Sequence, residues 1–198
     1  NYYLTNFSQN LDKKNIPESI RRLYEKEVQR IHKVVECQQP TYFDFRNDLY
    51  LKDLGLVRLK LIPVGAELVD ECGGVPRSLF FRGGLPQLIK CTCFFVLKTK
   101  GFKPFYQLHL DRRNVADFTP EGWHKTYLRI AELLLINPEY KGFFGGSWFY
   151  DPALADISPH LNYLRIVRQQ GGAQIFYWDN DAATVNMSIN SSHTRNVM

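Results

Sequence analysis

The stretch FYQLHLD at residues 105–111 and the helical pattern that follows it at residues 119–137 decide the fold. The first predicts a short strand. The second begins with Thr119 and Pro120, which are typical of an N-cap and a first helical turn. The apolar segment GFFGGSWFY at residues 142–150 then predicts another strand. A strand, a helix and a strand in this order indicate a βαβ unit with parallel strands.

The same alternation extends in both directions from this unit. Apolar residues at helical spacing predict a helix over residues 85–100, which ends at Gly101. A third helix is predicted over residues 152–170, and the segment AQIFYWD at residues 173–179 predicts a last strand. From residue 84 onward the elements therefore alternate between helix and strand.

The N-terminal part has a different pattern. Residues 19–36 carry apolar side chains at spacings of three and four and predict an amphipathic helix. Val57, Leu59 and Leu61 alternate with basic residues and predict the first strand of a hairpin, which turns at residues 63–65. We therefore predict an α/β fold with a mixed central sheet, in which an N-terminal helix and hairpin precede a βαβαβ segment. Residues 1–180 are expected to form one domain, followed by a polar tail over residues 181–198.

The composition is that of an ordinary globular domain. The 198 residues are 44% hydrophobic and carry a formal net charge of +5. No apolar run approaches the roughly 18–20 residues that span a membrane, so we expect no membrane span. Residues 1–113 hold 19 basic and 12 acidic residues, whereas residues 114–198 hold 6 and 8. The basic part indicates either a surface for an anionic partner or a solvated helix face. No nucleic-acid-binding module is recognised, so we expect no nucleic acid partner.

The four cysteines do not form a recognisable metal or disulfide framework. Cys91 and Cys93 are separated by one residue, and no second Cys or His pair stands at zinc-finger spacing. Four cysteines in a chain of this length are too few for a secreted disulfide scaffold. We expect reduced thiols, a cytoplasmic location and no metal.

His109 and Asp111 form the first candidate catalytic pair. Residues two apart in a strand point to one face, so the imidazole and the carboxylate are expected to share a surface at the end of a parallel strand. Three interpretations remain open. His109 is a general base whose pKa Asp111 tunes, or a buried histidine bonded by a neighbouring acid, or part of a metal site with His124 or His160.

A second candidate is Arg82-Gly83-Gly84, directly before a predicted helix. Amides at a helix N-terminus favour a phosphate group, and glycines allow a ligand to approach the backbone. The alternative is a plain turn before a helix.

The densest motif is the segment at residues 145–152. Two glycines inside an apolar strand lower its stability unless a ligand or another backbone comes close, or a bulge forms. The alternatives are a ligand-lining strand, a packed core strand whose Asp151 caps the next helix, and a serine nucleophile. The candidate cofactor-binding residues are Gly145, Gly146 and Ser147, and the candidate substrate-binding residues are Trp148, Tyr150 and Asp151.

Taken together, FYQLHLD, the helix at 119–137, GFFGGSWFY, the helix at 159–170 and AQIFYWD resemble the C-terminal half of the GNAT superfamily of acyl-CoA N-acyltransferases. The resemblance covers residues 55–180 and lies in topology more than in motif. It implies that the strands at 105–111 and 142–150 part to hold the pantetheine arm of the cofactor, and that Tyr163 protonates the departing thiolate. The pyrophosphate loop of the family is not matched after the first of these strands, where Arg112-Arg113-Asn114-Val115 contains no glycine.

This resemblance implies an acyltransferase that takes an acyl group from acyl-CoA, or from a thioester on an acidic acyl carrier protein, to a small-molecule amine. His109 or Asp111 would deprotonate the amine, Tyr163 would act as the acid, and backbone amides near Gly145 and Gly146 would polarise the acyl carbonyl. The alternative function is a non-catalytic binding or interaction domain with a similar fold.

Overall fold

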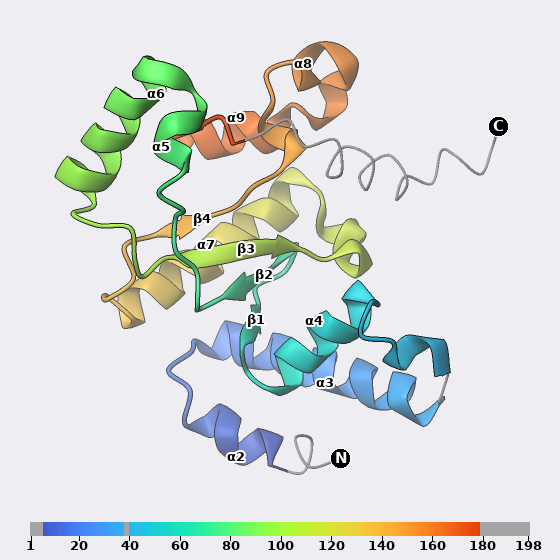
Figure 1. Cartoon of the computed structure of the whole chain (residues 1–198). Coiled ribbons are helices and arrows are strands. Elements are labelled where there is room, and N and C mark those ends of the chain that lie inside the picture. Colours follow the sequence, from blue (N-terminus) through green and yellow to red (C-terminus); the bar gives the residue numbers. More distant parts are fainter. Residues whose placement is uncertain (1–5, 38–39, 179–198) are drawn as a thin grey trace. The chain divides into compact units, whose positions relative to one another are not determined.

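The computed structural model describes residues 6–37 and 40–178 (Figure 1). The chain divides into two compact units. The first unit comprises residues 1–75 and 102–173, and the second comprises residues 76–101 and 174–198. The expected single domain over residues 1–180 stays a prediction, because two compact units of one chain can still unfold together. The expected polar tail at 181–198 lies outside the described residues.

The first unit contains a four-stranded mixed sheet in the order β1-β2-β3-β4 (Figure 1). The strands are β1 (Leu61–Pro63), β2 (Glu67–Asp70), β3 (Tyr106–Leu110) and β4 (Phe143–Phe144). Antiparallel pairing joins β1 to β2 and β2 to β3, and β3 pairs with β4 in parallel. The predicted α/β class, the mixed sheet and the hairpin are confirmed.

The hairpin strand begins later than the sequence pattern predicted. Helix α4 (Asp48–Val57) begins where the Asn47 side chain accepts a hydrogen bond from the Leu49 amide, and it continues through Val57. Leu59 then has a positive φ of 55°, which turns the chain before β1. The prediction that Val57 and Leu59 belong to a strand was therefore wrong, because a capped helix already contains the first of them.

Two helices of the N-terminal part pack against β1. They are α3 (Glu18–Glu36), which follows the short α2 (Phe7–Asp12), and α4. Ile20, Tyr24 and Ile31 form the buried face of α3, and the Tyr24 hydroxyl donates to the Leu61 carbonyl at 2.6 Å. The predicted helix at 19–36 is confirmed.

Helix α7 (Pro120–Ile136) crosses from β3 to β4 and confirms the predicted βαβ unit. The Thr119 hydroxyl accepts a hydrogen bond from the Gly122 amide, as expected for an N-cap. Trp123, Ile130 and Leu133 are buried on this helix. The apolar periodicity and the predicted N-cap therefore placed this helix correctly.

The chain after α7 differs most from the prediction. Up to residue 178, only Phe143 and Phe144 of this part form a strand, and residues 148–150 form the short 3-10 helix η4 (Trp148–Tyr150). The expected helix at 152–170 is divided into α8 (Leu154–Ile157), η5 (Pro159–Leu161) and α9 (Tyr163–Gln170). Ser158 has non-helical angles before Pro159, as expected of a residue that precedes proline, and this interrupts the helix.

The second unit consists of α5 (Leu79–Arg82), α6 (Gly84–Cys91), a π-helix η2 (Thr92–Lys98) and the segment 174–178. The expected helix over 85–100 is present, with its last part as the π-helix. The expected strand at 173–179 is not, since residues 173–178 lie in no strand and residue 179 is outside the described part. The Gln87 side chain bonds both the amide and the carbonyl of Tyr177, so these backbone groups pair with a side chain instead of a neighbouring strand.

Candidate functional site

The candidate site lies in the first unit, where β3 and β4 part. The parallel pairing covers Tyr106 with Phe143 and Gln107 with Phe144, after which β4 ends while β3 continues to Leu110. A Cβ placed on Gly145 would lie 3.2 Å from the Leu108 Cβ, so the two chains are still in contact there. A Cβ on the next residue, Gly146, would have no atom within 4 Å. The ladder between the two segments therefore ends at Phe144, and the Cβ side of Gly146 faces open space.

His109 lies near the end of β3 and faces Asp70 on the neighbouring strand. The distance between His109 Nε2 and Asp70 Oδ2 is 3.9 Å, and both side chains are partly exposed. Burial lowers the pKa of His109 below its ordinary value, and the positive charge of Lys52 adds to this, whereas Asp70 and Asp48 oppose it. The imidazole is therefore neutral at neutral pH, which is the form that accepts a proton.

Asp111 follows β3 and is 1% exposed. Its carboxylate accepts hydrogen bonds from Arg113 Nε at 2.9 Å and Nη2 at 2.5 Å, as well as from the Arg113 backbone amide. Burial opposes the charge, but these bonds outweigh it and hold the pKa of Asp111 below its ordinary value. Asp111 is thus engaged by Arg113 and not directed at His109.

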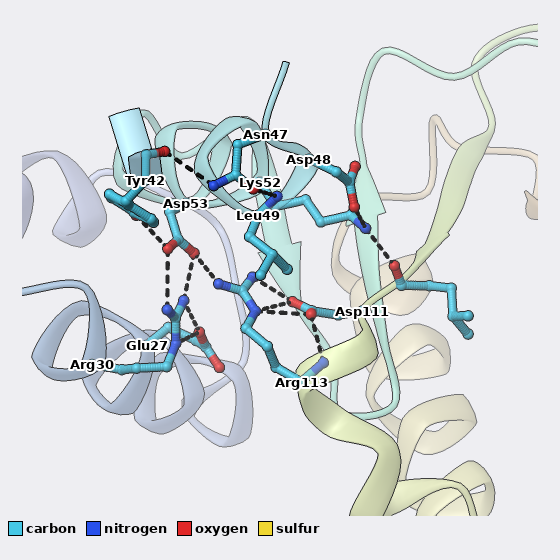
Figure 2. Close-up of polar contacts among 11 residues, drawn as sticks. Glu27, Arg30, Tyr42, Asn47, Asp48, Leu49, Lys52, Asp53, Asp111 and Arg113 are labelled. Atoms are coloured by element: carbon cyan, nitrogen blue, oxygen red, sulfur yellow. Dashed lines mark hydrogen bonds and ion pairs between the residues drawn. The ribbon is translucent and has the colours of Figure 1, made fainter. Parts of the chain in front are cut away.

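Arg113 connects Asp111 to a second buried carboxylate, Asp53 on α4. Arg113 Nη1 donates to Asp53 Oδ1 at 2.5 Å, and Asp53 is 2% exposed (Figure 2). Arg30 on α3 donates to both oxygens of Asp53, and the Tyr42 hydroxyl donates to Oδ2 at 2.6 Å. We call Arg30, Tyr42, Asp53, Asp111 and Arg113 the Asp53 network.

The Asp53 network ties two helices to the end of β3. Burial disfavours the charge on Asp53, but the hydrogen bonds from Arg30, Tyr42 and Arg113 outweigh this and hold the pKa of Asp53 below its ordinary value. Lys52, next to Asp53, adds a bond to the Leu110 carbonyl at 2.8 Å. The end of β3, where His109 stands, is therefore held in place by charged hydrogen bonds.

A separate buried ion pair lies on the opposite face of the sheet. Glu67 on β2 is opposite Leu110 in the register, and both of its oxygens accept from Arg168 Nη2 of α9, at 3.1 and 3.0 Å. The guanidinium carbon of Arg168 lies 4.8 Å from the Trp123 ring centroid and 4.5 Å from that of Tyr150. Tyr150, a predicted substrate-binding residue, thus packs on Arg168.

Tyr163 stands at the start of α9 on this same face. Its hydroxyl donates to the Phe118 carbonyl at 2.6 Å, and burial raises its pKa. Leu110 packs against the cluster that contains Tyr163, and its neighbour His109 points to the other face of the sheet. The structure therefore sets His109 and Tyr163 on opposite faces beside the same strand end.

The remaining residues of the 145–151 segment have local partners. Ser147 Oγ accepts from the Phe149 amide at 3.3 Å, and Asp151 Oδ1 accepts from the Ala153 amide at 2.8 Å. Trp148 is exposed and its ring lies 4.4 Å from that of Phe149. Asp151 therefore stabilises the turn before α8 and does not cap the helix, whose N-cap is Ala153, so the interpretation of a core strand whose Asp151 caps the next helix was wrong.

Arg82, Gly83 and Gly84 belong to the second unit, whereas the other candidate residues belong to the first. Arg82 donates to the Trp178 carbonyl at 2.8 Å. Gly83 contacts the Gln87 side chain closely, and Gly84 has a positive φ of 68°. The glycines thus form the turn between α5 and α6.

Sequence reasoning missed the residues with the most charged contacts, namely Arg30, Asp53, Arg113, Glu67 and Arg168. One signal was available, because Glu67 interrupts an apolar strand, where an acid requires a partner. Arg113 was visible only as part of a basic cluster, since its partner Asp53 lies 60 residues away.

Within residues 6–37 and 40–178, no group of three or more His, Cys, Asp or Glu residues is arranged to hold a metal ion. The metal interpretation of His109 therefore has no support among these residues. None of the described helices combines the length and the apolarity needed to cross a bilayer. Comparison with known proteins found no matching family model, curated protein or solved structure.

Proposed function

We propose that the chain is an acyltransferase that moves an acyl group from a thioester donor to an amine, with a fold similar to the GNAT superfamily. The parting of β3 and β4 carries this proposal. Parallel strands that pair at one end and part at the other leave backbone N–H and C=O groups on their facing edges without a ladder partner. An extended ligand such as a pantetheine arm can use these groups in the manner of an added strand.

His109 is the proposed general base. Its lowered pKa leaves the imidazole unprotonated at neutral pH, and Asp70 lies close enough to stabilise the imidazolium that forms. The amine nitrogen attacks the thioester carbonyl carbon, the carbon–sulfur bond breaks, and His109 accepts the proton that the nitrogen loses. The hydrogen-bonded Asp111 is better suited to fixing the strand end than to accepting this proton.

Tyr163 is the proposed acid for the departing thiolate. Its raised pKa keeps the hydroxyl protonated, and a thiolate is a strong enough base to take that proton. A group held between two parting strands is accessible from both faces of the sheet, so residues on opposite faces can act on it. The amides near Gly145 and Gly146 are proposed to polarise the acyl carbonyl, because the open space beside Gly146 leaves room for it.

The proposed donor is acyl-CoA or an acyl group on an acidic carrier protein, and the acceptor is a small-molecule amine near Trp148. A cytoplasmic location belongs to the same proposal. It is supported by the four cysteines, which are free thiols.

The test combines ligand binding with turnover. Thermal melting and native mass spectrometry are measured with acyl-CoAs of increasing chain length and with acyl carrier protein, and thiol release is then followed with a panel of amines. We expect one donor to raise the melting temperature and to release thiol. His109→Gln should retain the donor-induced shift and lose turnover by about 10²–10⁴-fold, the usual contribution of a general base.

His124→Gln is the matched control, because His124 is an exposed histidine on α7 in the same unit. It should leave turnover unchanged. Two results would overturn the proposal: no donor changes the melting temperature or the mass, or His109→Gln turns over as fast as the unmodified chain.

A second candidate function is a non-catalytic binding domain. It is favoured by the intramolecular bonds of Asp111 and Tyr163, which occupy two of the three side chains that the sequence predicted to be catalytic. Stabilisation by a thioester donor without thiol release toward any amine would support this candidate over the enzyme.

A further inference from the structure

The second unit exposes several large apolar side chains on its helices, most of them along α6 and η2. Phe81, Leu85, Ile89 and Leu97 are between 57% and 77% exposed. Leu85, Ile89 and Leu97 stand at multiples of four residues in α6 and η2, with the exposed Cys93 completing the row, whereas Phe81 lies on α5 beyond the turn at Gly83 and Gly84. Residues four apart lie toward one side of a helix, and η2 continues α6 with wider π-helical turns.

The opposite side of the same helices forms the core of the second unit. Leu79, Gln87, Cys91 and Phe95 are buried there. The ring of Phe176, in the segment 174–178, lies 5.4 Å from that of Phe95. The apolar row is therefore not the side that packs within this unit, and the helices are apolar on two sides.

The charge of this segment has one sign. Residues 76–101 contain five basic residues and no acidic residue, so the rest of the chain has 20 Lys and Arg against 20 Asp and Glu. Lys90 and Lys98 directly follow Ile89 and Leu97 in sequence, and Lys90 Nζ also donates to the Ile175 carbonyl at 2.7 Å. Lys90 Nζ lies 5.0 Å from the centroid of the Phe176 ring, and Lys98 Nζ lies 5.6 Å from that of Phe94. The whole net charge of the protein therefore equals that of the segment that carries the apolar row.

We propose that this surface, defined by Leu85, Ile89, Leu97, Lys90 and Lys98, binds an anionic lipid bilayer. A helix with large apolar side chains on one side and basic residues beside them lies in the membrane interface, with the apolar groups among the acyl chains and the basic groups at the headgroups. Lysine stems bury apolar length while the ammonium stays in the polar layer.

A bilayer fits these observations better than a nucleic acid does. A row of side chains along helices projects outward, and a fluid bilayer adapts to such a surface. Phosphate backbones contact lysines without burying aliphatic side chains, so they would leave Leu85 and Ile89 in water. The bilayer satisfies both the charge and the apolar area.

Vesicle cosedimentation tests the proposal with the full chain and without any acyl donor, so its outcome is independent of the proposed acyl transfer. We expect binding to vesicles that contain phosphatidylglycerol and at least about 10-fold weaker binding to pure phosphatidylcholine, because each basic residue near an anionic surface contributes about 5-fold. Added salt should weaken the binding.

Two pairs of substitutions separate the apolar and electrostatic parts. Leu85→Ser with Ile89→Ser should reduce binding by at least about 10-fold. The matched control is Leu135→Ser with Ile157→Ser, since these residues are 81% and 78% exposed in the first unit. Lys90→Gln with Lys98→Gln should reduce binding on the order of 10-fold, whereas Lys26→Gln with Lys125→Gln should not.

Three results would overturn the proposal. The first is that the chain does not bind anionic vesicles. The second is that the Leu85→Ser, Ile89→Ser variant binds them as well as the Leu135→Ser, Ile157→Ser variant does. The third is that light scattering detects a dimer that the Leu85 and Ile89 substitutions dissociate, which would assign the row to contact with a second copy.

Discussion

The Asp53 network and the Arg168–Glu67 pair both bury charge beside the same sheet, but they compensate it differently. Asp53 accepts hydrogen bonds from Arg30, Tyr42 and Arg113, and its pKa is held low. Glu67 has Arg168 as its charged partner, and burial raises the pKa of Glu67 despite that attraction. The difference teaches that several hydrogen-bond donors can stabilise a buried carboxylate where one arginine does not suffice.

The largest predicted effect is that of Arg113→Ala. This substitution leaves two carboxylates, Asp53 and Asp111, without the cation that joins them. Breaking a buried pair from one side typically costs about 3–5 kcal/mol of unfolding free energy, and we expect the upper part of that range. Urea denaturation measures it. A loss of unfolding free energy below about 1 kcal/mol would show that water compensates the two carboxylates when Arg113 is removed.

Arg168→Met is expected to have a smaller effect, about 3 kcal/mol, because Glu67 can take up a proton when its partner is lost. Adding Glu67→Leu should recover most of the stability, since two apolar side chains can replace a buried pair at little cost. The same denaturation experiment compares the single and double variants. A double variant less stable than Arg168→Met would contradict the contrast between the two sites.

The pH dependence of stability distinguishes the two sites by sign. Asp53 and Asp111 have lowered folded-state pKa values, so their contribution is present above about pH 4, the ordinary carboxyl pKa, and is lost as pH falls through the folded-state values. Glu67 has a raised folded-state pKa, so its contribution to stability is present at low pH and is lost as the pH rises. The reason is that the unfolded chain loses the Glu67 proton at a lower pH than the folded chain does.

Denaturation between pH 3 and pH 6, a window set by the ordinary carboxyl pKa of about 4, tests this. The slope of stability against pH should become shallower in Arg113→Ala and steeper in Glu67→Gln. Equal slopes in all three chains would refute the assignment.

The smallest predicted effect is that of Tyr42→Phe, which removes one donor from Asp53 and leaves both arginines. A hydrogen bond to a charged group contributes about 1.5–3 kcal/mol, and we expect a loss near the lower value. Tyr50→Phe is the control, because its ring lies 5.5 Å from that of Tyr42 in the same aromatic cluster. It should change stability by less than about 0.5 kcal/mol. Equal losses in both variants would attribute the effect to ring packing.

The sequence was most informative where local signals agreed with each other. The Thr119 cap, Pro120 and the apolar spacing predicted α7 within a residue at each end. It was least informative where a distant side chain decides the backbone. Phe149 and Tyr150 look like strand residues, yet they pack around Trp123 and Arg168. Segment 173–178 has strand composition, but Gln87 bonds Tyr177 from 90 residues away.

The candidate site was predictable only in part. The position of His109 near the end of a parallel strand followed from the order of elements, and β3 confirms the strand. The hydrogen bonds between Asp111 and Arg113 could not be predicted, because the spacing of residues along one strand does not show which cation in the following turn will contact the carboxylate. Pairs of charges that are distant in sequence require the fold itself.

The bond between Gln87 and Tyr177 also bears on the order in which the chain folds. The helices of the second unit are synthesised first, but the segment that completes its aromatic core follows about 80–90 residues later. At about 5–20 residues per second, a ribosome takes roughly 5–20 s to add it. During that interval Phe94 and Phe95 lack the ring of Phe176, so the nascent second unit exposes aromatic side chains that its folded state packs.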